Sequence, residues 1–245
     1  MNTYQDYAKR LQDILTIESQ PIAARFVKQE DVVSKDYDGQ SKLRYCQALY
    51  RARRGDKVYV NAENIVCPAS AAAFGLKPLP EKLASGEMMS SMGLFYNKEV
   101  AARVMSQMPR LPMGEYKGVL VSPLAECDFE PQVIIIESQP EHLMWVALAS
   151  IFKTGDRLQF DSGIFQATCV DSTLTPFVQN KVNSSLGCYG CREATDLEDG
   201  ECLIGFPYPK LQEIVENLEM LLQKAIPRVR GKGVFKSTFP AQCGS

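Results

Sequence analysis

The 245-residue sequence contains only one histidine, His142, and it has no excess of charge of either sign. A single imidazole excludes the catalytic zinc centres that require two or three histidines. With 27 Lys and Arg against 29 Asp and Glu, the formal net charge is −2. That balance provides no basic surface for nucleic acid or for an anionic membrane, so we expect neither as a partner.

Long hydrophobic runs and common catalytic motifs are absent as well. The longest apolar stretches, QVIIIE (132–137) and LMWVALASIF (143–152), are too short to cross a bilayer. No phosphate-binding loop, G-x-G-x-x-G or G-x-S-x-G motif is present, which disfavours nucleotide enzymes and serine hydrolases. The polar start, MNTYQDYAKRLQDIL, is neither a signal nor a transit peptide, so we expect a cytoplasmic protein.

Helical and extended patterns alternate along the chain, with no long linker between them. This alternation predicts an α/β or α+β fold: a single compact domain over residues 1–230, with interleaved helices and strands and a mixed sheet. Residues 231–245 are expected to form a poorly ordered tail.

The sequence is unusual in having eight cysteines: Cys46, Cys67, Cys127, Cys169, Cys188, Cys191, Cys202 and Cys243. A chain of this size needs no disulfides to fold, and it shows no export signal. In a reducing cytosol, many thiols indicate metal binding, catalysis or buried packing. Because histidine is almost absent, sulfur is expected to provide most ligands of any metal.

Two of these thiols, Cys188 and Cys191, lie three positions apart in NSSLGCYGCREATDLEDGE (183–201). A C-x-x-C pair brings two thiolates to one metal or cluster from a single turn. A redox dithiol and a simple turn also fit this spacing, although the thioredoxin-like context of a strand leading into a helix is not expected here.

Three neighbours of the pair are expected to bind the cofactor. Gly187 and Gly190 give the backbone freedom to direct N–H groups toward sulfur. Arg192 places a positive charge beside an anionic centre, and we expect its side chain to point toward the site.

Two isolated thiols complete the predicted ligand set. Cys67 precedes Pro68 at the predicted start of a helix, where the helix dipole favours a thiolate. Cys46 lies on the apolar face of a helix predicted over residues 41–55, one helix and one strand before Cys67. Both are also compatible with plain core packing. We interpret Cys169 and Cys202 as core thiols, Cys127 as a loop thiol and Cys243 as a free thiol of the tail.

The ligand pattern favours an iron–sulfur cluster over zinc. Structural zinc sites are usually built from two close ligand pairs, whereas this sequence combines one pair with two separate thiols. A [4Fe-4S] cluster tolerates scattered ligands because its irons are separate atoms. Zinc remains the alternative cofactor.

Four stretches of the chain resemble the uncharacterised ArCR family of archaea and anaerobic bacteria, also called domain of unknown function 169. They are RYCQALYRARRGDKVYV, ENIVCPASAAAFGL, FEPQVIIIESQPEHLMWVALA and NSSLGCYGCREATDLEDGECLIGFPYPKL, between Ser41 and Leu211. The resemblance implies that Cys46, Cys67 and Cys188 belong to the shared pattern. It does not decide between three and four cysteine ligands, and three would leave one iron open for a substrate.

Two functions therefore follow from the sequence. The first is an iron–sulfur protein, either a redox carrier or an enzyme that uses the cluster on a small substrate. Its partners would be a small molecule or a redox partner protein, and a homo-oligomer is compatible with the sequence. The alternative is a non-enzymatic binding or regulatory protein whose cysteines are structural or bind zinc.

Overall fold

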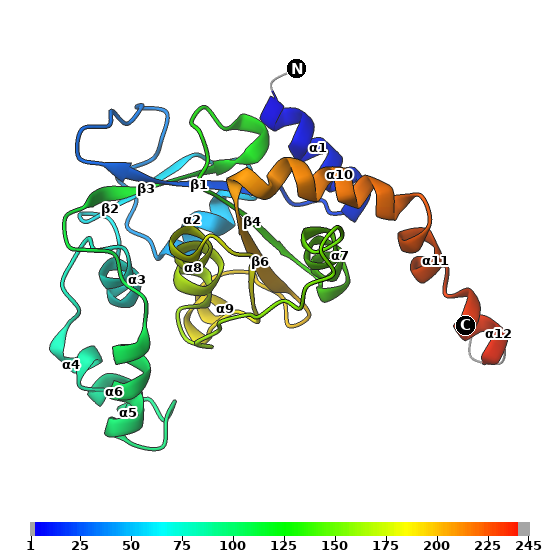
Figure 1. The fold of residues 1–245 in the computed structure, drawn as a ribbon. Coiled ribbons are helices and arrows are strands. Elements are labelled where there is room, and N and C mark those ends of the chain that lie inside the picture. The colour runs from blue at the N-terminus through cyan, green and yellow to red at the C-terminus, as the bar shows by residue number, and fades with distance from the viewer. Residues whose placement is uncertain (1–2, 240–245) are drawn as a thin grey trace.

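Six strands form one sheet in the computed structural model, which describes residues 3–239 (Figure 1). Their order across the sheet is β2-β3-β1-β4-β6-β5. The strands are β1 (Ile22–Lys28), β2 (Val58–Asn61), β3 (Tyr116–Pro123), β4 (Val133–Ser138), β5 (Asn183–Ser185) and β6 (Cys202–Pro207).

Helices fill most of the intervening chain. The α-helices are α1 (Thr3–Leu15), α2 (Tyr45–Ala52), α3 (Pro68–Ala73), α4 (Glu81–Ala84), α5 (Glu87–Ser91), α6 (Lys98–Gln107), α7 (Pro140–Ser150), α8 (Thr175–Gln179), α9 (Tyr189–Ala194), α10 (Leu211–Leu222), α11 (Ala225–Gly231) and α12 (Gly233–Thr238). Two short 3₁₀ helices, η1 (Leu124–Glu126) and η3 (Tyr208–Lys210), and a π-helix, η2 (Ala167–Leu174), complete the elements. Among residues 3–239, no helix is long and apolar enough to cross a membrane.

The α+β alternative is confirmed, but the predicted mixed sheet is wrong. Every pairing between named strands is antiparallel. Within the described residues, parallel pairing is limited to the isolated bridges Asp38–Val58 and Leu43–Ile65. The interleaved helices suggested parallel crossovers. Here strands that run in the same direction, such as β1 and β2, are not neighbours, because an antiparallel strand lies between them.

Both faces of the sheet are buried, which explains the continuous apolar run of β4. Val133 and Ile135 point to one hydrophobic cluster, whereas Ile134 and Ile136 point to another, as the two-residue period of a strand requires. Helices α2, α3 and α8 and the π-helix cover the first face, and α1, α7 and α10 cover the second (Figure 1). Full burial of such a side chain stabilises the fold by about 1.5–3 kcal/mol.

Two parts of the chain lie away from this sheet. Helices α4, α5 and α6 pack against one another and form a wing at the lower left of Figure 1. At the other end, α11 and α12 extend away from the sheet after α10. Within the stretch from residue 231 that the sequence predicts as a tail, the structure has the exposed helix α12 at Gly233–Thr238. Cys243 lies outside the described residues.

Candidate functional site

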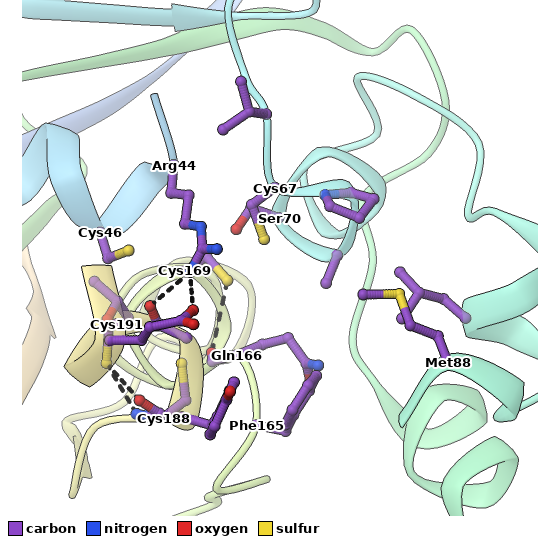
Figure 2. Close-up of a pocket in the computed structure, with 18 of the residues that line it drawn as sticks. Arg44, Cys46, Cys67, Ser70, Met88, Phe165, Gln166, Cys169, Cys188 and Cys191 are labelled. Carbon is purple, nitrogen blue, oxygen red and sulfur yellow. Dashed lines mark hydrogen bonds and ion pairs between the residues drawn. The ribbon is translucent and has the colours of Figure 1, made fainter. Parts of the chain in front are cut away.

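The structure brings the four predicted ligands, Cys46, Cys67, Cys188 and Cys191, to one pocket of about 180 Å³ (Figure 2). The pocket lies on the first face of the sheet, where α2, α3, α9 and the π-helix meet. All seven cysteines within the described residues are free thiols. Segments that are far apart in the sequence therefore form one sulfur-rich surface.

The two isolated thiols come from helix N-termini. Cys67 is the N-cap of α3, and Pro68 occupies the first helical position, as the Cys-Pro order predicts. Cys46 is half-buried in the first turn of α2. That helix begins at Tyr45 rather than at the predicted residue 41, with Arg44 as its N-cap.

The C-x-x-C pair lies at the start of another helix. Cys188 is the N-cap of α9, a few residues after the short strand β5. A strand thus leads into a helix at this pair, contrary to the sequence-based expectation. The backbone N–H of Cys188 donates to Cys191 Sγ at 2.9 Å, and Cys191 Sγ donates to the carbonyl of Cys188 at 3.2 Å.

Only one of the two glycines beside the pair requires a glycine backbone. Gly187 has φ +83°, and a Cβ there would lie 2.8 Å from Leu197 Cδ2 and 3.4 Å from Cys191 Sγ. Gly190 lies within α9 without positive φ, and a Cβ there would be 3.7 Å from the nearest Arg44 nitrogen. The conformational requirement predicted for Gly190 is therefore wrong.

Arg192 does not point toward the thiols as the sequence suggested. Its guanidinium donates to the backbone carbonyls of Glu198 at 2.9 Å, Leu186 at 2.5 Å and Glu201 at 2.8 Å. These bonds hold the loop after α9 against the turn before it. The reason is geometric: an arginine in the last turn of so short a helix reaches the neighbouring loop carbonyls first.

The cation at the pocket is Arg44 rather than the predicted Arg192. Arg44 lines the pocket and donates through Nη1 to the carbonyl of Gly190 at 3.0 Å and to Glu193 Oε2 at 3.0 Å. It therefore joins the N-terminus of α2 to α9. Its position two residues before Cys46 was the available sequence signal.

The π-helix supplies a fifth thiol, which was predicted to be core packing. Cys169 is buried and lines the same pocket, with Sγ 3.7 Å from the carbonyl of Gln166. Thr168 lines the pocket beside it, and its buried hydroxyl has no hydrogen-bond partner within residues 3–239. Gln166 precedes the π-helix in the left-handed conformation at φ +69°.

Polar bonds fix the π-helix beside the pair. Asn183 in β5 donates to the carbonyl of Asp171 at 2.7 Å, and Ser185 in β5 donates to Asp171 Oδ2 at 3.3 Å. Ser172 and Thr173 donate to the carbonyl of Thr168 at 2.9 and 2.8 Å. The strand that leads to Cys188 is thereby attached to the helix that presents Cys169.

Hydrogen bonding favours the thiolate form of Cys188. The pKa of Cys188 is lowered to about 5, first by the Cys191 thiol and then by backbone N–H groups of Cys191, Ala167 and Gln166, against the effect of burial. The pKa of Cys191 is raised, first because it donates to Cys188 and then by burial. The pocket thus stabilises one thiolate and keeps its partner protonated.

The remaining thiols of the pocket affect one another electrostatically. The pKa of Cys46 is raised to about 12, first by burial and then by its charge interactions with Cys188 and Cys67. Burial also raises the pKa of Cys169, followed by the charges of Cys67, Cys188 and Cys46 among the causes. Cys46, Cys67, Cys169 and Cys188 are therefore close enough for charge on one to disfavour charge on another.

A buried ion network supports the loop after α9. Arg53 lies 3.4 Å from Glu137 and 3.7 Å from Glu201, and it also pairs with Asp196. Burial raises the pKa of Glu137 to about 7, although Arg53 opposes this rise. The acidic stretch after the cysteine pair is thus partly anchored on Arg53, the C-cap of α2.

The other cysteines lie apart from this pocket. Cys127, predicted to be a loop thiol, is buried and has Sγ 3.1 Å from the carbonyl of Phe129. Cys202 is half-buried in β6 and packs against the second face of the sheet. Neither lines the pocket.

A helix-covered antiparallel sheet with five thiols around one pocket defines an α+β protein with a cysteine-lined site. The chain belongs to the uncharacterised ArCR family, domain of unknown function 169, whose model matches residues 10–217. It is also similar to an uncharacterised protein of Methanocaldococcus jannaschii, with 27% identity over 226 residues, covering 91% of this chain and 97% of that protein. No solved structure matches the chain.

Proposed function

We propose that this cytoplasmic protein binds a [4Fe-4S] cluster in the thiol-lined pocket. The observation behind the proposal is that Cys46, Cys67 and Cys188, from three separate segments, line one pocket together with Cys169 and Cys191. Thiolate ligands suit iron–sulfur clusters, and free thiols suit a reducing compartment.

The donor groups around the pocket fit such a cluster. Cys188 is already favoured as a thiolate, with a pKa of about 5. Thr168 offers a buried hydroxyl without a partner among the described residues, and such a group can donate to cluster sulfur. Arg44 is the positive group closest to the negative charge that a thiolate-bound cluster carries. Thiol ligands, a free donor and a cation are thus present together.

The spacing of the groups fits a cluster better than a single zinc ion. Zinc draws four ligands to about 2.0–2.3 Å from one atom. Within residues 3–239, no group of three or more His, Cys, Asp or Glu could hold one metal ion. A cubane instead lies between its ligands and keeps their sulfurs apart, so thiols around the rim of a pocket suit it.

A bound cluster would supply either one-electron transfer or an iron that acts as a Lewis acid. The protein's own contribution is to orient the thiolates, to place Arg44 beside them and to limit access of water. Val66, Met88 and Met92 form part of the wall and are 51%, 41% and 44% exposed. This apolar, open side suits either a small molecule or the surface of a redox partner protein.

Anaerobic purification followed by metal and sulfide analysis tests the proposal. We expect brown protein with broad visible absorption and about four irons and four sulfides per chain. Cys188→Ala removes the thiol that is favoured as a thiolate and should abolish this content, whereas Cys202→Ala, outside the pocket, should not change it. Colourless protein with one zinc per chain would contradict the cluster and favour the zinc alternative.

The position of Cys188 also favours a second candidate, thiol–disulfide exchange. A thiolate at a helix N-cap with a protonated thiol three residues later is the arrangement of a redox dithiol. Cys188 would attack a disulfide of a substrate protein, and Cys191 would then displace the substrate thiol. The dithiol loses two electrons and two protons, and the substrate disulfide is reduced to two thiols. Metal-free protein that reduces a disulfide substrate, and loses this activity in Cys188→Ala, would support this candidate.

A further inference from the structure

Five thiols line the pocket, whereas the irons of a [4Fe-4S] cluster bind about four protein ligands in total. Sequence spacing favours Cys191 as the partner of Cys188, because the two lie three positions apart. The structure shows that Cys191 and Cys169 differ in what their sulfurs contact. We assign the fourth ligand on the basis of this difference.

The sulfur of Cys191 is already engaged with the turn that contains Cys188. It accepts the backbone N–H of Cys188 at 2.9 Å and donates to the Cys188 carbonyl at 3.2 Å (Figure 2). Its side chain also packs in a small buried cluster with Leu197 and Leu203, against the sheet. Binding iron would remove the donated proton and pull this sulfur away from the turn.

The sulfur of Cys169 is held less closely than that of Cys191, although Ser70 hydrogen-bonds to it and the residue packs in the core cluster of the first face. Its hydrogen bond to the carbonyl of Gln166 is long at 3.7 Å. Cys67, Cys188 and Cys46 all lie within electrostatic reach of it. Figure 2 shows Cys169 facing the pocket between the segments that carry Cys46 and Cys67.

The secondary structure at Cys169 is a second indication of a binding role. Helices with π geometry are rare and occur frequently at functional sites. This π-helix presents Cys169 and the unpartnered hydroxyl of Thr168 to the same pocket. At its start, the N–H groups of Gln166 and Ala167 are directed at the Cys188 sulfur. The π-helix therefore faces the proposed cluster with a ligand and with donors.

We propose that Cys169 completes the ligand set with Cys46, Cys67 and Cys188, and that Cys191 is a positioning residue that holds Cys188 in place. This inference rests on the proposed cluster and assigns its fourth ligand. It predicts opposite behaviour for two cysteines that both line the pocket.

The test compares iron, sulfide and electron paramagnetic resonance spectra of anaerobically reconstituted protein. Cys169→Ser keeps the size of the side chain but removes the thiol, and we expect about three irons per chain or fewer, with a three-iron signal after oxidation. Cys191→Ser keeps a hydroxyl that can replace both bonds to Cys188, so it should retain about four irons and the wild-type reduction potential. Cys202→Ala, outside the pocket, is the matched control.

A further variant tests the positioning role. Cys191→Ala leaves the Cys188 N–H without its acceptor, so we expect the cluster to remain but its reduction potential to shift and its half-life in air to shorten. Rescue of both properties by Cys191→Ser is the expected signature. Four irons in Cys169→Ser, or loss of iron in Cys191→Ser, would overturn the inference while leaving the cluster itself established. Wild-type protein that takes up no iron would instead refute the proposed function.

Discussion

The two glycines beside the cysteine pair should respond in opposite ways to alanine. In Gly187→Ala, the left-handed backbone at φ +83° costs about 1–2 kcal/mol once a Cβ is present. The new Cβ would also lie 2.8 Å from Leu197 Cδ2, an overpacking that costs about 1–3 kcal/mol. We therefore expect the free energy of unfolding to fall by about 2–5 kcal/mol.

Gly190→Ala is the matched control, since it adds the same methyl group three residues later. Its Cβ would lie 3.7 Å from Arg44 Nη1 and 4.0 Å from Cys188 Sγ, which are ordinary contacts. Within α9, alanine should stabilise the helix by up to about 1 kcal/mol.

Equilibrium urea unfolding of the metal-free variants measures both changes under one set of conditions. The variants should differ in sign, with Gly187→Ala below the wild type and Gly190→Ala at or above it. Equal unfolding free energies in the two variants would refute this account of the turn, as would a fully stable Gly187→Ala protein.

Two further predictions concern titratable groups. Burial raises the pKa of Glu137 to about 7, so the native carboxyl holds its proton more tightly than the unfolded one. Its contribution to the free energy of unfolding is complete below about pH 4.5 and is lost as the pH rises through about 7, a change of about 3 kcal/mol. Urea unfolding at pH 5 and pH 8 should therefore show a smaller loss of stability in Glu137→Gln than in the wild type. An identical pH dependence in the two proteins would contradict the assignment. The pKa of Cys188 is about 5 and that of Cys46 is raised to about 12, so in metal-free protein at pH 6 Cys188 should react with iodoacetamide first. Peptide mapping identifies the labelled thiol. Preferential labelling of Cys46 would contradict this order of reactivity.

The parts of the site that the sequence could predict are those set by local chemistry. A cysteine before proline indicates a helix N-terminus, and Cys67 is the N-cap of α3. A glycine directly before a C-x-x-C pair indicates a strained turn, and Gly187 has positive φ. Each signal depends on a few neighbouring residues.

The parts that the sequence could not predict depend on tertiary packing. No side-chain pattern distinguishes a π-helix from an α-helix. The sequence therefore predicts Cys169 as a core thiol, which its burial confirms, but not its place on the pocket wall. Arg192 was placed at the thiols because it follows Cys191, but the carbonyls of a folded loop bind its guanidinium. The sheet direction was also missed, because strands buried on both faces look alike in parallel and antiparallel sheets.

The wide separation of the pocket's thiols also has a consequence for biosynthesis. Cys46 and Cys191 lie 145 positions apart, and β6, which pairs with β4 and β5, follows later still. At typical rates of translation, about 7–30 s pass between the appearance of the first and the last of these thiols. During that interval, Cys46 is part of a nascent chain that does not yet contain Cys191. The proposed cluster would therefore have to be assembled after nearly the whole domain has been translated, and until then the thiols are exposed to oxidants outside a closed pocket.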